Sequence, residues 1–385
     1  MTTDPPAAGE RRLTRHADVR AVLADPRFHV PAAPAAALGT GSGPGMAWLR
    51  GAVSRFANGP EHARRRSRAQ GLLDALDPVR LRGEARERTR AELAGGAPVD
   101  VMARIARRVP VGVLATRLGV PGDRREEVVA AVTAIAAAYH LPSAGAPPGR
   151  EAADAAVGVL ADALGGGDAP EPGLLAAVAG VLVQACDATA GLVGNALAVV
   201  ARLPATPAPG WRAEALLAEI LRWDPPVRLT RRVAAEDATA GGLPVPAGAV
   251  LVLDLAAANR DPEVFPDPHR FDPYGRGRGG RHLGFGDGIR PCPGEDAALA
   301  LAAGVVEAAA GHRLADPRIS SEQILYEQIP YEPSRNLRVP ASLWLAHPEG
   351  HGPERHGPER HGPERHGPEG HDTARHDRET AEGPR

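Results

Sequence analysis

Residues 285–294 read Phe285-Gly286-Asp287-Gly288-Ile289-Arg290-Pro291-Cys292-Pro293-Gly294, and an Ala-rich run that predicts a helix over 294–311 follows at once. A thiolate at the N-terminus of a helix is stabilised by the positive end of the helix dipole and by unpaired backbone N–H groups. Glycines on both sides let the backbone turn tightly and approach a flat ligand closely. Arg290, two residues before Cys292, can reach a carboxylate on that ligand. The stretch therefore suits a metal-bound sulfur.

The stretch resembles the haem-binding loop of cytochromes P450, with Phe285, Gly288, Cys292 and Gly294 on the four pattern positions. Such a match would arise by chance on the order of once in a thousand sequences or less. The resemblance implies that Cys292 ligates the iron of haem b, that Gly286 and the rest of the loop bind the cofactor, and that O2 is the co-substrate. The alternative is a buried structural cysteine in a Gly-rich turn.

Further basic residues stand where the family binds the two haem propionates. The segment Pro60-Glu61-His62-Ala63-Arg64-Arg65-Arg66 resembles the family's His-x-x-x-Arg helix, whose i, i+4 spacing points both side chains to one face. Arg232 stands at another propionate-binding position. Together with Arg290, the resemblance therefore implies four propionate ligands. Arg64, Arg65 and Arg68 are surplus, and form either a solvated basic face or a docking face for an acidic ferredoxin.

A Glu-x-x-Arg pair, Glu219 and Arg222, lies on a predicted helix over 211–223. By itself this is an ordinary helix ion pair worth a few tenths of a kcal/mol. In the family the pair is buried and locks to an arginine of the later meander. Pro268-His269-Arg270-Phe271 supplies that arginine as Arg270, which implies a structural triad.

The longest apolar helix is predicted over 173–203, and the resemblance places it over the oxygen side of the haem. The family usually has an acid followed by two threonines there. An alignment without a gap puts Asp187 at the acid position and Ala188 in place of the first threonine, with Thr189 next. A one-residue gap would put Thr189 in the relay position but would rotate later side chains by about 100°. The ungapped reading implies unusual proton delivery, as in biosynthetic members where water or a substrate hydroxyl serves.

Composition favours helices, because the 43 % apolar content comes mainly from Ala, Val and Leu while aromatics make up only 3 %. The net charge of −2 gives no global attraction to nucleic acid or to membranes. Two cysteines are too few for a disulfide framework, and Cys186 is interpreted as a small buried hydrophobe. No signal peptide or bilayer-spanning apolar run is expected, so we expect a cytoplasmic protein. We also expect it to be a monomer.

The expected organisation is a flexible segment over 1–11, a cytochrome P450 domain over 12–347 and a disordered tail of His-Gly-Pro-Glu-Arg repeats over 348–385. The fold class is mainly α with small β-sheets, as one haem-binding domain. Residues 31–44 are a candidate substrate lid. Besides those already given, helices are predicted over 12–26, 61–75, 85–95, 98–119, 124–140 and 151–164. Strands are predicted within 227–254 and near 325–345, and an extended meander over 259–291.

The resemblance implies a soluble, bacterial-type, biosynthetic member that takes electrons from ferredoxin and ferredoxin reductase. We expect it to hydroxylate a natural-product intermediate, and its substrate to be a small molecule or a peptide. Gly165–Pro172 replaces a helix common in the family, so the distal pocket is expected to be open. Two alternatives remain: a P450 that crosslinks aromatic side chains of a peptide without inserting oxygen, and a non-catalytic P450-like recruitment protein.

Overall fold

The computed structural model describes residues 10–33, 44–139, 149–165, 170–201, 211–272, 274, 279–315, 329–334 and 336–347. Contacts divide the chain into one unit over 1–350 and a second over 351–385, which lies wholly outside the described residues. The predicted tail, most of the candidate lid and the break after Gly165 also lie outside them, so these remain predictions.

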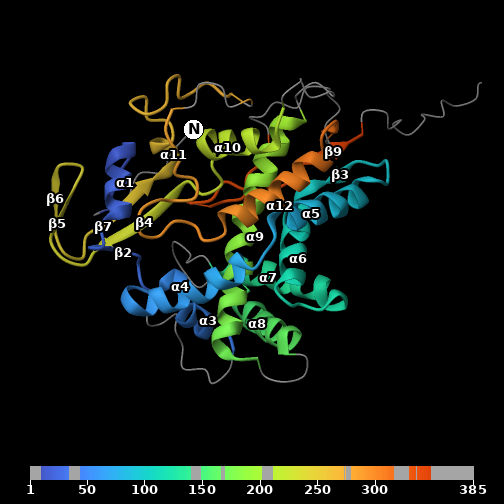
Figure 1. Ribbon diagram of the computed structural model, residues 1–385, viewed down its shortest axis with the longest axis horizontal. Coiled ribbons are helices and arrows are strands. Elements are labelled where there is room, and N and C mark those ends of the chain that lie inside the picture. The colour runs from blue at the N-terminus through green and yellow to red at the C-terminus, as the bar shows by residue number, and fades with distance from the viewer. Residues whose placement is uncertain are drawn as a thin grey trace, which may run out of the picture. The chain divides into compact units, whose positions relative to one another are not determined.

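Helices make up most of the described structure, in agreement with the predicted fold class (Figure 1). They are α1 His16–Ala24, α3 Met46–Ala52, α4 Gly59–Asp74, α5 Pro78–Leu93, α6 Arg108–Arg117, α7 Arg125–Tyr139, α8 Arg150–Gly165, α9 Pro172–Val200, α10 Ala213–Trp223, α11 Leu255–Ala258 and α12 Glu295–Ala308. Single short turns of helix, η1 Ser54–Phe56, η2 Met102–Ala106 and η3 Gly122–Arg124, precede α4, α6 and α7.

Strands form three small sheets. The largest has the order β1-β7-β4-β2, with β1 Glu10–Leu13 parallel to β7 Val250–Asp254, and with β4 Leu229–Ala234 between β7 and β2 Phe28–His29. The others are β3-β9-β8 (Val99–Asp100, Trp344–Ala346, Arg313–Leu314) and the hairpin of β5 Ala238–Ala240 with β6 Leu243–Val245. The prediction of strands within 227–254 is therefore confirmed.

Three predicted helix boundaries are wrong. The helix expected from Arg12 begins at His16, because residues 10–13 pair with β7, and Arg11 belongs to this strand rather than to a flexible segment. Helix α5 begins at Pro78 instead of residue 85, because the Asp77 carboxylate caps it by accepting from the Val79 N–H at 2.9 Å. The range 98–119 contains β3 and η2 before α6.

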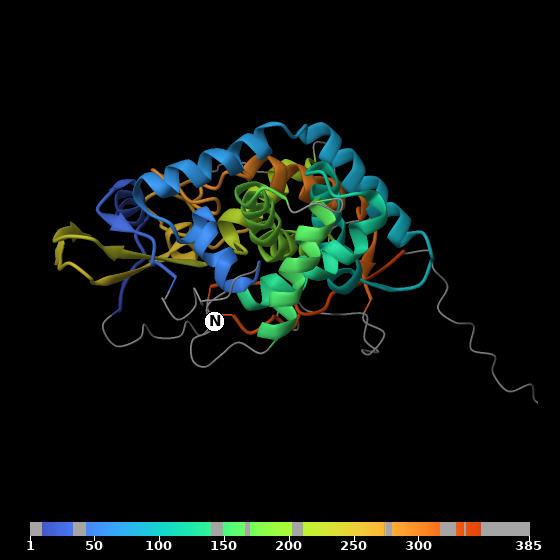
Figure 2. The same ribbon diagram turned by 90° about the horizontal axis from the view of Figure 1, so that it is seen from below.

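Helix α9 is the centre of the larger hydrophobic core. It packs against α3, α4, α6, α7, α8, α10 and α12, and the perpendicular view shows it among those helices while α4 and α5 run along one edge (Figure 2). Contrary to expectation, its length and hydropathy alone would suffice to cross a membrane. However, 72 % of its apolar window is buried within the described fold, as for a core helix.

Neighbouring segments lie close to α9 at two glycines, Gly191 and Gly194, which have no side chain to keep them away. A Cβ at Gly191 would lie 2.8 Å from both the Arg338 carbonyl oxygen and Pro226, and one at Gly194 would lie 2.8 Å from the sulfur of Met102. These approaches fix α9 against the segment before β4 and the segment before β9.

Candidate functional site

A cavity of about 590 Å³ lies along α4 and α9 and is bounded by β4 and by the loop before α12. Its size is that of a small-molecule or cofactor site. The wall contains all eight residues predicted to bind the cofactor: His62, Arg66, Arg232, Phe285, Gly286, Arg290, Cys292 and Gly294.

The loop before α12 is shaped by glycines and by contact with α1. Gly286 and Gly288 have φ of 72° and 70°, values that favour glycine. A Cβ at Gly288 would collide with the carbonyl group of Leu23, whose oxygen accepts the Ile289 N–H at 3.2 Å. The loop is closed by the Cys292 N–H, which donates to the Phe285 carbonyl at 2.7 Å. This backbone shape holds Cys292 just before the N-terminus of α12, where Gly294 is the cap residue.

The two cysteines have different surroundings. The Cys292 side chain is exposed because it faces the cavity, even though protein atoms crowd its other sides. That crowding raises the pKa of its thiol, and the Gly294 amide and the Arg66 charge act in the opposite direction. Cys186 on α9 is 1 % exposed and outside the cavity wall, and burial raises the pKa of its thiol to about 12. Its interpretation as a buried hydrophobe is therefore confirmed.

Four predicted cationic residues gather on the cavity wall. Arg66 donates to the Pro291 carbonyl at 2.6 Å, Arg290 to the Ala57 carbonyl at 2.7 Å, and Arg232 to the Thr230 hydroxyl at 3.3 Å. Burial together with nearby arginines lowers the pKa of Arg232 to about 10 and that of His62 to about 4. Within the described part of the chain none of the three arginines has an ion pair with a carboxylate. The wall therefore carries positive charge available to an anionic ligand.

One further cation of the cavity wall, Arg55 in η1, was not predicted from the sequence. It lines the same cavity, and its charge lowers the pKa of both Arg232 and Arg290. Because it lies outside any recognised motif, no sequence signal marks it. Only the fold brings it to the site.

Helix α9 brings two of its three predicted residues to the cavity. Ala188 and Thr189 line it, whereas Asp187 does not. Asp187 instead accepts from Arg107 Nε at 2.9 Å, and Arg107 Nη2 also donates to both carboxylate oxygens of Glu332, at 2.7 and 2.8 Å. Burial lowers the pKa of Arg107, but the Glu332 hydrogen bonds and the Asp187 charge raise it above its usual value.

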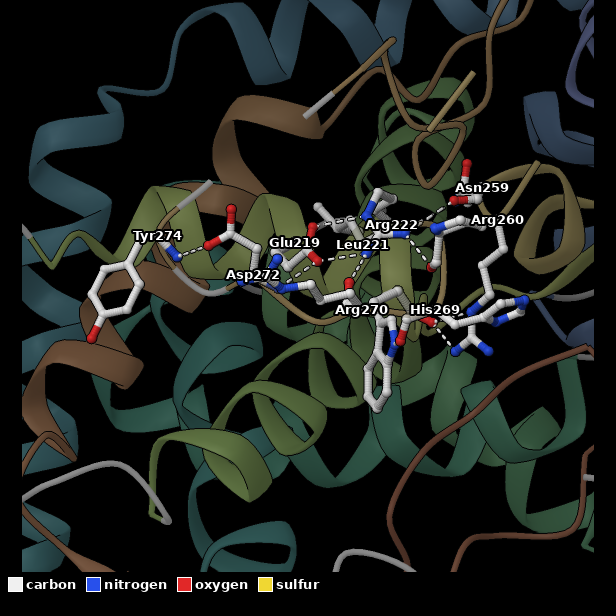
Figure 3. A network of polar contacts seen from close by, with 11 residues as sticks. Glu219, Leu221, Arg222, Asn259, Arg260, His269, Arg270, Asp272 and Tyr274 are labelled. Atoms are coloured by element: carbon white, nitrogen blue, oxygen red, sulfur yellow. Dashed lines mark hydrogen bonds and ion pairs between the residues drawn. The ribbon is translucent and has the colours of Figure 1, made fainter. Parts of the chain in front are cut away.

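The Glu219–Arg222 pair lies in a buried polar network at the end of α10 (Figure 3). Glu219 and Arg222 are 1 % and 5 % exposed, and two hydrogen bonds of 2.8 and 2.6 Å join them. The prediction for Arg270 is wrong: its side chain is exposed, and only its carbonyl oxygen takes part, accepting from Arg222 Nη2 at 2.8 Å. Asp272 contributes its backbone N–H, which donates to Glu219 at 2.9 Å. The meander is thus held mainly through its backbone.

Comparison with known proteins gives the same family throughout. The Cytochrome P450 family model matches residues 213–301. Biflaviolin synthase CYP158A1 of Streptomyces coelicolor is 31 % identical over 311 residues, 73 % of this chain and 74 % of that protein. Vitamin D(3) 25-hydroxylase of Pseudonocardia autotrophica is 30 % identical over 318 residues, 73 % of this chain and 75 % of that protein.

A shorter match has higher identity. Putative cytochrome P450 140 of Mycobacterium tuberculosis is 47 % identical over 137 residues, so the match spans 34 % of this chain and 31 % of that protein. Among solved structures, that of CalO2 superimposes with a TM-score of 0.71 at 24 % identity, covering 88 % of this chain and 91 % of the other. Biflaviolin synthase CYP158A1 and Vitamin D(3) 25-hydroxylase each match at 30 % identity or more over more than two thirds of both chains, so the chain belongs to the cytochrome P450 family.

Proposed function

We propose that this chain is a haem-thiolate monooxygenase in which Cys292 ligates the iron of haem b and O2 serves as co-substrate. The observation that carries the proposal is the position of Cys292 on a cavity whose wall also holds His62, Arg66, Arg232 and Arg290. Family membership implies a haem, and a bound haem-thiolate supplies activated oxygen and, through the thiolate, electron density that promotes O–O cleavage.

The residues of the cavity fit that cofactor. Arg66, Arg232 and Arg290 lack carboxylate partners within the described chain. Burial, followed by repulsion from Arg55 and from one another, lowers the pKa of Arg232 and Arg290. Two propionates would relieve this repulsion through charge-assisted hydrogen bonds. Burial raises the pKa of the Cys292 thiol, while the Gly294 amide and the Arg66 charge oppose that rise and stabilise the thiolate. Gly286 and Gly288 keep the loop backbone in a conformation that lets Cys292 face the cavity.

The α9 wall would hold the groups that manage protons. Thr189 is 2 % exposed and lines the cavity. Among residues 187–189 we therefore assign its hydroxyl as the side-chain group that carries protons. Asp187 faces Arg107, from which it could reach the cavity through water. Ala188 leaves a methyl group at the position of the family's first threonine. We therefore propose that water or a substrate hydroxyl completes the relay.

Hydroxylation of a natural-product intermediate is the reaction we favour. One oxygen atom of O2 enters a C–H bond and the other leaves as water, with two electrons and two protons supplied. We assign the electrons to ferredoxin and its reductase, with a small molecule or peptide as substrate. The relative named Vitamin D(3) 25-hydroxylase supports a hydroxylase. In line with the sequence analysis we further propose a cytoplasmic monomer, a P450 domain over 12–347 to which β1 adds residues 10 and 11, and a disordered tail over 348–385.

The second candidate is oxidative crosslinking of two aromatic side chains of a peptide. Two C–H or O–H bonds would each lose a hydrogen and a new bond would join the rings, while O2 takes up two further electrons and two protons to give two waters. Ala188 supports it, since the wall lacks the usual hydroxyl there. Mass spectrometry of the product separates the two candidates: a gain of one oxygen supports hydroxylation and a loss of two hydrogens supports crosslinking.

Haem ligation is tested by the absorption spectrum of the reduced, CO-bound protein. Wild type and Cys186→Ser should both show the Soret band of a thiolate-ligated haem, because Cys186 is outside the cavity wall. Cys292→Ser should lose that band. Equal bands in the Cys292 variant would contradict the ligand assignment. Absence of the band from haem-reconstituted wild type would instead favour a non-catalytic recruitment protein.

A further inference from the structure

The cavity holds more positive charge than a haem needs. Under the proposed function, Arg66, Arg232 and Arg290 with His62 face two propionates, and the Cys292 thiolate is bound to iron. Arg55 adds a fourth guanidinium that has no carboxylate partner among the described residues. Arg55 is itself exposed, so its guanidinium is open to an anion that enters the cavity. The excess therefore points to a second anionic partner in this cavity.

Arg55 differs from the three cavity arginines that are not assigned to the haem, Arg64, Arg65 and Arg68, because each of those three is paired with a carboxylate. Arg64 pairs with both oxygens of Glu61, at 3.0 and 2.7 Å. Arg68 pairs with Glu171 at 2.7 Å. Arg65 is also bound to Glu61. Within the described ranges Arg55 has no carboxylate partner, and its guanidinium carbon lies over the face of the Phe56 ring, 5.8 Å from the ring centroid.

The segment that carries Arg55 is fixed on both sides. On one side, Arg65 of α4 donates to the carbonyl oxygens of Gly51 and Val53, the latter at 3.1 Å. On the other, Arg290 donates to the Ala57 carbonyl at 2.7 Å. Asn58 then anchors the chain through hydrogen bonds with the backbone of Val30, at 3.0 and 3.1 Å. A cation on a backbone held in this way is already positioned before a ligand arrives.

We propose that Arg55 binds an anionic group of the substrate, and that the substrates of this protein are organic acids such as carboxylates. The guanidinium offers a planar pair of N–H donors that matches a carboxylate. The same wall also carries apolar side chains, among them Trp48, Ala52 and Val53 from α3 and the residue after it. An acid with an apolar body would therefore place its charge at Arg55. This inference rests on the proposed function, because the other cations are assigned to the haem.

The test is calorimetric titration of the haem-loaded protein with three aryl acids, phenylacetate, indole-3-acetate and 1-naphthylacetate, and with their primary amides. Each pair has the same shape and differs in charge. Wild type should bind at least one acid more tightly than its amide by on the order of tenfold, since a charge-assisted hydrogen bond contributes that much. Arg55→Gln should abolish the preference, and Arg55→Lys should restore part of it.

Arg64→Gln is the matched control. Arg64 lines the same cavity but is paired with Glu61, so its loss should leave the acid preference within about twofold of wild type. Equal loss in both variants would mean a general effect of cavity charge and would overturn the assignment to Arg55. The inference is also overturned if no acid binds wild type more tightly than its amide.

Haem content, read from the CO-bound Soret band of each variant, separates the inference from the proposed function. Wild type that takes up no haem contradicts the proposed function, and the acid preference can still be measured on that protein. Arg55→Gln that binds haem normally but loses the preference supports the inference. Arg55→Gln that loses haem together with the preference overturns it, because Arg55 would then bind a propionate.

Discussion

The two walls of the cavity are built in different ways. The loop over 284–294 is shaped by its own backbone, through Gly286, Gly288 and the hydrogen bond from Cys292 to Phe285. The α9 wall is a regular helix whose chemistry depends on side chains from other segments. Arg107, the residue before α6, binds both Asp187 of α9 and Glu332. Local sequence can specify the glycine turns and the internal hydrogen bond of the loop, whereas the loop's contact with Leu23 and the pairing of Asp187 require segments far apart in the chain to meet.

The largest expected effect tests the steric basis of the loop. Gly288→Ala should lower the free energy of unfolding by roughly 3 kcal/mol or more, because its Cβ would collide with the Leu23 carbonyl and its φ is unfavourable. Gly286→Ala is the matched control, with similar φ but its nearest neighbour 3.7 Å from the added Cβ. It should cost only roughly 1 kcal/mol. Urea unfolding of the haem-free chain measures both, and equal losses would remove the steric explanation.

A smaller effect tests the α9 wall. Arg107→Gln leaves the carboxylates of Asp187 and Glu332 without their shared cation, and the Arg107 side chain is only 17 % exposed. We expect a loss of roughly 2 kcal/mol in the same urea measurement. Glu332→Gln should cost less than about 1 kcal/mol, because Glu332 is more exposed and Asp187 keeps its partner. A larger loss from the glutamate variant would show that Arg107 acts mainly through Glu332.

The smallest expected effect concerns the charge of His62. In the folded, haem-free chain its pKa is lowered to about 4 by burial, Arg290 and Arg66, so the folded state binds fewer protons than the unfolded state between pH 6.5 and 4. Stability should therefore be fully present above pH 6.5 and fall as the pH drops through this window. His62 is half-buried and its charge is partly screened by solvent, so its share is about 1 kcal/mol. His62→Gln should make the pH profile shallower, and an unchanged profile would contradict this.

Sequence patterns located one wall better than the other. Cys292, Arg290, His62 and Arg66 could be placed on one cavity because they stand at positions of two motifs that resemble those of the family. The mainly α fold class followed from composition and from the family resemblance, and most helices followed from apolar periodicity. The start of α5 could have been found from Asp77 and Pro78, a cap residue before a proline.

Long-range pairings were beyond the sequence. Nothing near Arg55 marks it as a cavity residue, because the carbonyl groups that fix its segment are bound by arginines of α4 and of the Cys292 loop. Arg270 shows the reverse error. Its position in the meander suggested a buried guanidinium, yet the backbone carbonyl satisfies Arg222 and the side chain stays in solvent. Which atom of a residue joins a network depends on tertiary packing.

The contact between α1 and the Cys292 loop also has a consequence for synthesis. The Leu23 carbonyl oxygen accepts from Ile289, and Arg20 pairs with Asp287, so a segment near the N-terminus completes the shape of a loop made much later. During translation α1 leaves the ribosome long before its partner exists. Helix α1 therefore stays loosely docked or unfolded until the Cys292 loop has emerged. Haem binds at the last stage of folding and not while the chain is still being synthesised.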